Sequence, residues 1–181
     1  IPIQPFTYKM ILSSDFYENI WAVIESKSHI EFQKGTVRSL EADEDGVRVH
    51  TDGEHFRASK VFNSISDYTD YKTQKKYPVL QQHFVGWFIK TKKPSFDVST
   101  ATFMDFNIPQ EGNTRFMYVL PTSENEALFE YTLFSEKLLS KETYEAGIKD
   151  YLEKRGITEY TIDRKEQGAI PMTAFPFRNN N

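Results

Sequence analysis

The sequence predicts an α+β fold in which an antiparallel sheet is combined with helices. Three observations support this class. Four segments rich in aromatic and β-branched residues follow one another between residues 80 and 134, joined by links that contain turn-forming residues. A shorter β-meander precedes them, and helical spacing of apolar residues occurs once before the meander and once after the four segments. Strands that follow one another without intervening helices favour antiparallel pairing.

Composition limits the possible functions. The 181 residues suffice for one domain or a large part of one. With 22 basic and 26 acidic residues the net charge is −4, so a general nucleic-acid binder is not expected. The absence of cysteine excludes disulfides and thiolate metal sites and fits a reducing, cytoplasmic compartment. Aromatic residues make up 15% of the chain and supply the bulk of a core.

The first expected element is a helix. Asp15 is predicted to cap it, with Glu18 as the partner three residues later. Its apolar face is formed by residues at helical spacing, namely Phe16, Ile20, Val23 and Ile24.

Short strands are predicted next, separated by polar turns. Asp52-Gly53 is a strong hairpin signal, because glycine tolerates the positive φ of a tight turn. The pattern indicates a three-stranded meander flanked by one strand on each side. The predicted strands are His29–Phe32, Thr36–Ala42, Val47–Thr51, Phe56–Ala58 and Lys60–Ile65. Residues 66–78 read as a loop, in which Lys72, Lys75 and Lys76 form a solvated surface more readily than a binding patch.

The main sheet is expected from four strands at residues 80–89, 101–106, 114–120 and 127–134. The last of them is apolar on both faces, which indicates that it is covered on both sides. A helix over residues 140–155 should follow, capped by Ser140 and ended by Gly156. A final strand is predicted at Tyr160–Ile162.

Several kinds of site find little support. His50 and His55 flank a hairpin turn and could approach each other, but no third metal ligand is evident. His83 is interpreted as a core residue. No nucleophile elbow, Walker or Gly-x-Gly-x-x-Gly pattern occurs, and no apolar run is long enough to span a membrane as a helix.

Two carboxylates stand out because they interrupt apolar strands. Glu130 lies in Leu128–Thr132 and Asp105 in Phe103–Phe106. A carboxylate in such a strand must pair with a cation, face a cavity or keep its proton. One interpretation is therefore structural: each acid bonds to a base such as Arg115, or lies at an exposed edge. The other is a general acid held protonated among aromatic rings, which suits protonation of an alkene and stabilisation of a carbocation.

Around these acids the sequence resembles the lycopene cyclase family, the FAD-dependent carotenoid cyclases of bacteria and plants. The motifs that carry the resemblance are Gln82-His83-Phe84-Val85-Gly86-Trp87, Pro94-Ser95-Phe96-Asp97, Phe103-Met104-Asp105-Phe106, Arg115-Phe116-Met117-Tyr118-Val119-Leu120-Pro121-Thr122-Ser123, Leu128-Phe129-Glu130-Tyr131-Thr132-Leu133-Phe134 and Gly168-Ala169-Ile170-Pro171-Met172. Their order and spacing agree with the family over nearly the whole chain.

The resemblance implies roles for particular residues. Glu130 matches the acid that the family requires for cyclisation, whereas the second acid of the plant motif is Tyr131 here. Asp105 matches a second active-site acid, but Asn107 replaces the arginine that usually follows.

The resemblance also implies a domain organisation of the hydroxybenzoate-hydroxylase type. Residues 1–78 would belong to an FAD-binding domain, 79–172 to the substrate domain, and 173–181 to a tail that leads back to the first. We expect the chain to be the middle of a longer protein, with the Gly-rich FAD motifs outside it. Val37 and Ser64 would contact the cofactor.

The implied reaction is isomerisation of a lycopene end group to a ring. Reduced FAD would act without net redox change, and NADPH would keep it reduced. The substrate would be lycopene or a related linear carotenoid, and the enzyme peripheral to the membrane surface. The alternatives are a flavin monooxygenase or prenyl reductase acting on another isoprenoid, and a non-catalytic lipid-binding sheet domain.

Overall fold

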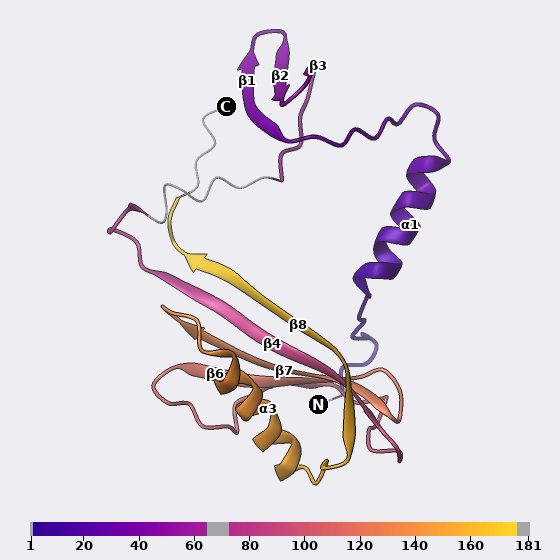
Figure 1. The fold of residues 1–181 in the computed structure, drawn as a ribbon, viewed down its shortest axis with the longest axis vertical. Helices are drawn as coiled ribbons and strands as arrows, with labels where there is room; N and C mark the ends of the chain where they lie inside the picture. Colours follow the sequence, from indigo (N-terminus) through magenta and orange to yellow (C-terminus); the bar gives the residue numbers. More distant parts are fainter. Residues whose placement is uncertain (1, 65–72, 177–181) are drawn as a thin grey trace. The chain divides into compact units, whose positions relative to one another are not determined.

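The computed structural model describes residues 2–64 and 73–176 (Figure 1). They form two compact units, one ending at Ser64 and one beginning at Thr73, and each is described by itself. The described residues contain two antiparallel sheets and two helices, so the α+β class is confirmed. Lys72 of the predicted basic cluster, Ile65 and the tail beyond Pro176 lie outside the described residues.

The first unit contains helix α1 (Ser13–Glu25) and a three-stranded sheet. The strands β1 (Val37–Asp43), β2 (Gly46–Thr51) and β3 (His55–Ala58) pair in the order β1-β2-β3, as the sequence predicts. Both pairings are antiparallel, and the tight turn at Asp52-Gly53 lies between β2 and β3.

Three predictions for this unit are wrong. Helix α1 begins before Asp15: Leu12 occupies the N-cap position without a side-chain hydrogen bond, and Asp15 lies in the first turn, where its charge still favours the helix dipole. Residues 29–32 and 60–64 are not strands. Neither segment has a neighbouring strand, and an extended segment without a ladder partner forms no sheet. The side chain of Phe62, in the second of these segments, is 97% exposed.

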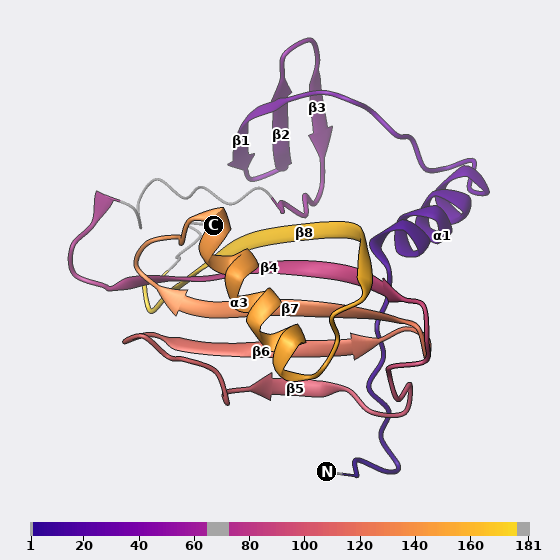
Figure 2. The same cartoon turned by 60° about the horizontal axis from the view of Figure 1, so that its bottom comes forward.

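The second unit is built on a five-stranded antiparallel sheet in the order β5-β6-β7-β4-β8 (Figure 2). Its strands are β4 (Val79–Thr91), β5 (Thr102–Asp105), β6 (Thr114–Pro121), β7 (Glu126–Ser135) and β8 (Tyr160–Thr173). The four strands predicted between residues 80 and 134 are therefore confirmed. Strand β4 is central and pairs with both β7 and β8 along most of its length.

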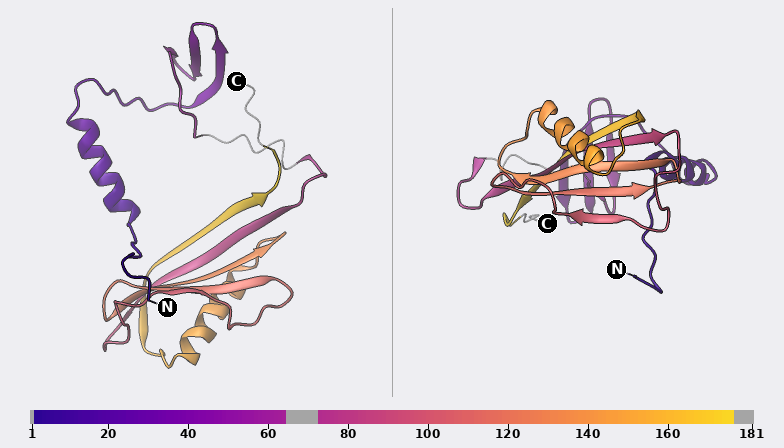
Figure 3. Two further views of the ribbon diagram at one scale, coloured as in Figure 1. Left: turned by 180° about the vertical axis from the view of Figure 1, so that it is seen from behind. Right: turned by 90° about the horizontal axis from the view of Figure 1, so that it is seen from below.

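Helix α3 (Lys141–Lys154) crosses one face of this sheet (Figure 3). Its N-cap is Ser140, whose side chain accepts a hydrogen bond from the backbone N–H of Thr143. After the last turn Gly156 takes a positive φ of 73°, a conformation that glycine adopts without strain. The predicted start and end of this helix are confirmed.

The core of the unit lies between α3 and the sheet. Strand β7 contributes Ala127, Phe129, Tyr131 and Leu133 to it. Leu128 and Thr132 on the opposite face of β7 are also buried, so this strand is covered on both sides, as predicted. The fully buried side chains under the helix include Trp87, Met117, Phe129, Leu133, Ile148 and Leu152.

Strand β8 is much longer than the predicted Tyr160–Ile162. It continues to Thr173 through the charged run Asp163–Glu166, which has no apolar alternation. The reason is its position: β8 is an edge strand, and its exposed side chains can be charged without cost.

Helix α3 approaches the sheet closely at Gly147. A Cβ atom at this position would lie 2.7 Å from Cε2 of the Tyr131 ring. That ring is buried, and its hydroxyl accepts a hydrogen bond from Arg115, so it is held in place. The close approach of helix and strand therefore requires glycine here.

We expect Gly147→Ala to lower the free energy of unfolding. Alanine gains about 1 kcal/mol of helix propensity over glycine, but overpacking a fixed core ring costs about 1–3 kcal/mol. Urea denaturation measures the difference, with the exposed helix variant Glu153→Ala as a control that should be close to neutral. A more stable Gly147→Ala protein would contradict the close approach.

Candidate functional site

The five-stranded sheet has two different faces. The α3 face carries the core beneath the helix. The other, which we call the open face, has no helix of the second unit lying across it in the part of the chain that the structure describes (Figure 3). Residues paired in register share a face of a sheet. By this rule the open face includes Phe84, Gly86, Phe88, Phe116, Tyr118, Leu128, Glu130, Thr132, Phe134, Arg164 and Glu166.

Glu130 lies near the middle of the open face. It is paired with Tyr118 of β6 on one side and with Gly86 of β4 on the other. Its Oε1 atom accepts a hydrogen bond of 2.7 Å from the hydroxyl of Thr132, which points to the same face two residues along β7. No lysine, arginine or histidine forms an ion pair with Glu130 within residues 2–64 and 73–176.

These surroundings favour the neutral form of the carboxyl group. Burial raises the pKa of Glu130 above its ordinary value, and the negative charge of Glu166 raises it further. The hydrogen bond from Thr132 opposes this rise, because it stabilises the charged form. The group is thus a carboxylic acid that keeps its proton to higher pH than an exposed glutamate does.

Aromatic rings continue from Glu130 toward the β5 edge. The aromatic patch consists of Phe103, Phe106, Phe116, Tyr118 and Phe134. Ring centroids of neighbouring members lie 5.2–6.2 Å apart, within contact range. Phe103 is 62% exposed and Phe106 is also exposed, whereas Phe116 is buried, so the patch is accessible to a ligand at its β5 edge.

The ring faces on this side can also hold a positive charge. The guanidinium carbon of Arg164 lies 3.9 Å from the centroid of the Phe88 ring, a cation–π contact. Both residues belong to the open face: Arg164 lies two residues before Glu166 on β8, and Phe88 lies two residues after Gly86 on β4. The open face therefore combines a carboxyl group whose pKa is raised with rings that can stabilise cations.

Asp105, the other predicted acid, lies on the opposite face. It is paired with Met117, a core residue beneath α3. Its Oδ2 atom accepts a 2.6 Å hydrogen bond from the hydroxyl of Tyr151 and lies 3.6 Å from the guanidinium of Arg155. The structure therefore does not bring Asp105 and Glu130 together.

The surroundings of Asp105 favour its charged form. The hydrogen bond from Tyr151 lowers the pKa of Asp105, and the N–H of Asn107 and the charge of Arg155 add to this. Burial, together with the same contact, raises the pKa of Tyr151 to about 12. Asp105 is thus a charged group that joins β5 to the last turn of α3.

We expect Asp105→Asn to reduce stability rather than chemistry. Hydrogen bonds to charged groups contribute about 1.5–3 kcal/mol, and about half of that should be lost when an amide replaces the carboxylate. Because the folded pKa is lowered, the stabilisation is present above the ordinary aspartate pKa and is lost as pH falls toward the folded pKa. Thermal denaturation between neutral and acidic pH measures both effects. An unchanged melting temperature together with lost turnover would instead indicate a catalytic role.

Arg115 pairs with neither predicted acid, so the arginine named in the structural interpretation is wrong, although Asp105 does lie near another arginine, Arg155. It is buried on the α3 face, where its Nη1 atom donates to Glu111 at 2.6 Å and to the hydroxyl of Tyr131 at 3.2 Å. His83 is a core residue, as predicted. Its ring nitrogens are bonded to Tyr144 of α3 at 2.5 Å and to Ser135 at 2.7 Å.

The two histidines of the small sheet do approach each other. The Nδ1 atoms of His50 and His55 are 3.1 Å apart, and Nε2 of His50 lies 3.4 Å from a carboxylate oxygen of Glu41. Within the described ranges no group of three or more possible ligands is arranged around a metal position.

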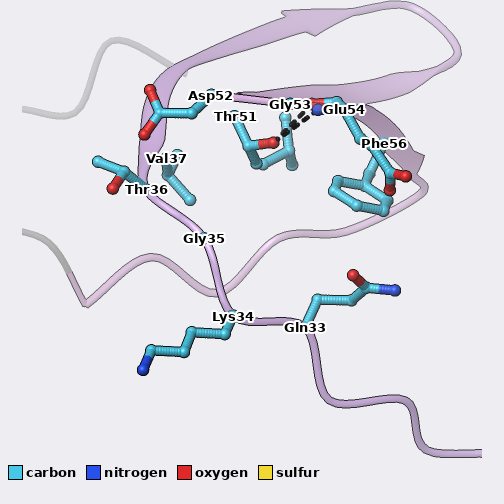
Figure 4. A pocket seen from close by; sticks show the side chains of 11 residues that line it. Gln33, Lys34, Gly35, Thr36, Val37, Thr51, Asp52, Gly53, Glu54 and Phe56 are labelled. Carbon is cyan, nitrogen blue, oxygen red and sulfur yellow. Dashed lines mark hydrogen bonds between the residues drawn. The ribbon is translucent and has the colours of Figure 1, made fainter.

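Val37, predicted to contact a cofactor, lines an open hollow of about 430 Å³ beside the small sheet. Figure 4 shows it with Thr51, whose hydroxyl donates to the carbonyl oxygen of Glu54 at 2.7 Å and accepts from its N–H at 3.1 Å. Ser64 is exposed and is not one of the lining side chains. The hollow is formed by strands, a turn and a connecting segment.

These residues do not fit FAD by themselves. A pyrophosphate is held best by the free N–H groups at the start of a helix. No helix begins among the residues that line the hollow, all of which are described.

The structure adds one residue to the site that the sequence did not single out. Glu166 of β8 lies on the open face in register with Gly86, and thus in line with Glu130. It lies beyond the predicted strand Tyr160–Ile162, in a charged run that begins at Asp163. The only earlier signal was its place two residues before the Gly168–Met172 motif.

Among the described helices none is both long and apolar enough to cross a membrane.

Comparisons with known proteins relate the sequence to one family. The sequence model of the family described as "Lycopene cyclase protein" matches residues 2–181. Two similar proteins are named lycopene beta-cyclase. That of Pantoea ananas is 31% identical over 111 residues, which are 61% of this chain and 29% of the relative. That of Paracoccus sp. (strain N81106 / MBIC 01143) is 34% identical over 92 residues, 50% of this chain and 23% of the relative. The matched segments thus span less than a third of either relative.

Proposed function

Because this chain belongs to the lycopene cyclase family, we propose that it carries the general acid of a lycopene cyclase and that this acid is Glu130. The whole enzyme would isomerise a linear lycopene end group to a ring. The proposal extends to this protein the activity in the names of its two relatives.

The observation that carries the proposal is the setting of Glu130. It is a half-buried carboxyl group with a raised pKa on an apolar sheet face, hydrogen-bonded to Thr132 and beside Tyr118 of the aromatic patch. A buried acid kept only for stability would be expected to have a cationic partner. A neutral acid in an apolar site can instead donate its proton.

In the proposed reaction the Glu130 carboxyl group gives its proton to the terminal alkene of the polyene. The cation formed at that end is attacked by a second double bond of the same chain, which closes the ring. The ring then loses one proton to water, and the Glu130 carboxylate takes a proton back from the solvent, so atoms and electrons balance as an isomerisation. The aromatic patch would stabilise the cation through its ring faces.

Asp105 would support this site without touching the substrate. Its contacts with Tyr151 and Arg155 on the α3 face suit a residue that fixes β5, the strand at the edge of the aromatic patch. We therefore propose a structural role for Asp105, although the family resemblance implies an active-site one.

We also propose reduced FAD as the cofactor, kept reduced by NADPH. This part of the proposal rests only on the resemblance to the family. When bound, the reduced flavin would supply electron density that stabilises a cation without net redox change. The first unit would then belong to an FAD-binding domain, in which Val37 and Ser64 contact the cofactor. No step above depends on the flavin, because the residues that line the hollow provide no pyrophosphate cradle.

We propose further that the enzyme works at a membrane surface, peripheral to it and on its cytoplasmic side. A long polyene is dissolved in the bilayer, so an enzyme that acts on it must reach the lipid phase. Exposed Phe103 and Phe106 at the β5 edge are suited to this contact.

The test is product analysis of the full-length protein. It is incubated with lycopene in liposomes, FAD and NADPH, and the carotenoids are separated and weighed by mass spectrometry. A cyclised product of unchanged mass is expected. A product heavier by oxygen would indicate a monooxygenase, one heavier by hydrogen a reductase, and unchanged lycopene bound to the protein a lipid-binding module.

A further inference from the structure

Glu166 extends toward Glu130 over Gly86, a position of the open face that has no side chain of its own. The two residues lie on strands β8 and β7, separated only by β4 (Figure 2). Their common partner in register is Gly86, which has no side chain. Since neighbouring strands lie about 4.8 Å apart, the two backbones are roughly 10 Å apart, a distance that two glutamate side chains can bridge.

The position of the Glu166 side chain follows from the space above Gly86. A Cβ atom on Gly86 would lie 2.9 Å from Cγ of Glu166 and 3.2 Å from its Oε1 atom. Cδ1 of Leu128 occupies the rest of that space, also at 2.9 Å. Glu166 therefore leans over β4 in the direction of β7, and Leu128 keeps the surroundings apolar.

The charges that face Glu130 can be assigned for every neighbouring strand. From β6 it faces the uncharged hydroxyl-bearing ring of Tyr118, and from β4 the uncharged Gly86. Thr132 is its neighbour on β7. From β8 come Glu166 and, two residues away, Arg164, whose guanidinium lies over the Phe88 ring. Glu166 is thus the negative charge that acts on Glu130.

We propose that Glu166 is a positioning residue of the cyclase, which acts across Gly86 to keep a proton on Glu130 until the polyene arrives. The inference rests on the function proposed above, because it concerns how the same acid is held ready. Two nearby carboxyl groups resist losing both protons, so the pair keeps one proton over a range of pH in which a single exposed glutamate is ionised. The burial of Glu166 has the same effect on its own pKa.

The experiment is the pH dependence of cyclisation by the full-length enzyme. Glu166→Gln removes the neighbouring charge, so Glu130 should lose its proton at lower pH. The basic limb of the kcat profile should move down by roughly one pH unit, as expected for one unit charge several ångströms away at a partly buried site. Below that limb the rate should be unchanged, and so should KM.

Two further variants separate this role from a structural one. Glu166→Asp keeps the charge, so it should move the basic limb of the profile less than Glu166→Gln does. Gly86→Ala keeps both acids but forces the Glu166 side chain aside, so its profile should move in the same direction as that of Glu166→Gln. The control is Glu159→Gln, an exposed residue just before β8, which should leave the profile in place.

A second readout avoids dependence on turnover. Infrared spectroscopy of the folded protein should show a protonated carboxyl band that Glu130→Gln removes. In Glu166→Gln, or in Gly86→Ala if the former does not fold, that band should disappear at lower pH than in the unmodified enzyme. If these variants leave both the pH profile and the carboxyl band unchanged while Glu130→Gln is inactive, the role of Glu166 is refuted and the proposed function is not. A fully active Glu130→Gln enzyme would overturn the proposed function as well.

Discussion

Replacing Glu130 by glutamine in the full-length enzyme is expected to lower the rate of lycopene cyclisation by about two to four orders of magnitude, the usual contribution of a general acid. Glutamine has nearly the same size and can still accept the hydrogen bond from Thr132. It has no proton to give to an alkene. The loss should therefore appear in kcat, whereas the binding of lycopene should change little.

The same substitution should leave the fold intact. Removing one partner of a buried ion pair costs about 3–5 kcal/mol, but Glu130 has no cationic partner among the described residues. Its folded pKa is raised, so the folded state binds more protons than the unfolded one, and stability falls as pH rises from the ordinary glutamate pKa through the folded value. Glu130→Gln should lack this part of the pH dependence and match or exceed the unmodified protein at neutral pH.

Turnover and thermal denaturation measured on the same preparation distinguish the two interpretations. Glu136→Gln, an exposed residue just after β7, serves as the control for charge removal. An inactive protein that has also lost several kcal/mol of stability would indicate that Glu130 holds the fold. A stable and fully active variant would refute the acid assignment.

Phe129→Ala is expected to have the largest effect on stability. Phe129 precedes Glu130 on β7 but points to the α3 face, where it is 0% exposed. Its ring centroid lies 5.9 Å from that of Phe96 and 6.2 Å from that of Tyr151. Truncating such a ring costs about 3–5 kcal/mol, because the transfer free energy is lost and a cavity remains.

Urea denaturation should detect this loss as a lower midpoint. Phe129→Leu is the matched variant, since it fills much of the cavity and should lose less. Cyclisation at low temperature, where the fold persists, should stay within a few-fold of the unmodified rate. A loss of turnover as large as that of Glu130→Gln in a folded Phe129→Ala protein would contradict the division of the sheet into two functional faces.

The parts of the fold that the sequence predicted well are those with strong local signals. Helix α3 has both a capping side chain at Ser140 and a glycine at its end, and β6 and β7 are dense in aromatic and β-branched residues. The predictions failed where a strand depends on its neighbour. Residues 29–32 look like a strand but have no partner, whereas the charged residues of β8 form one because β4 pairs with them.

The acids show the same limit at the level of the site. Glu130 could be found from its sequence, because a charge inside a two-sided apolar strand needs an explanation. The separation of Glu130 from Asp105 could not be predicted from the sequence. The face on which Asp105 lies depends on a register irregularity of β5 between Thr102 and Asp105, which includes Met104 at a φ of 54°. Glu166 could not be recognised either, because its relation to Glu130 exists only through the pairing of three strands.

The alternation of side chains along β7 has a consequence for how such an enzyme can change over time. Consecutive residues serve separate demands: those facing α3 pack into the domain core, and those facing away belong to the face on which we propose that the substrate binds. Substitutions at Phe103, Phe106 or Phe134 should therefore alter which polyenes are accepted while changing the free energy of unfolding little. A combinatorial library restricted to these positions should keep a high proportion of folded members, which makes this surface a suitable starting point for directed evolution toward other isoprenoids.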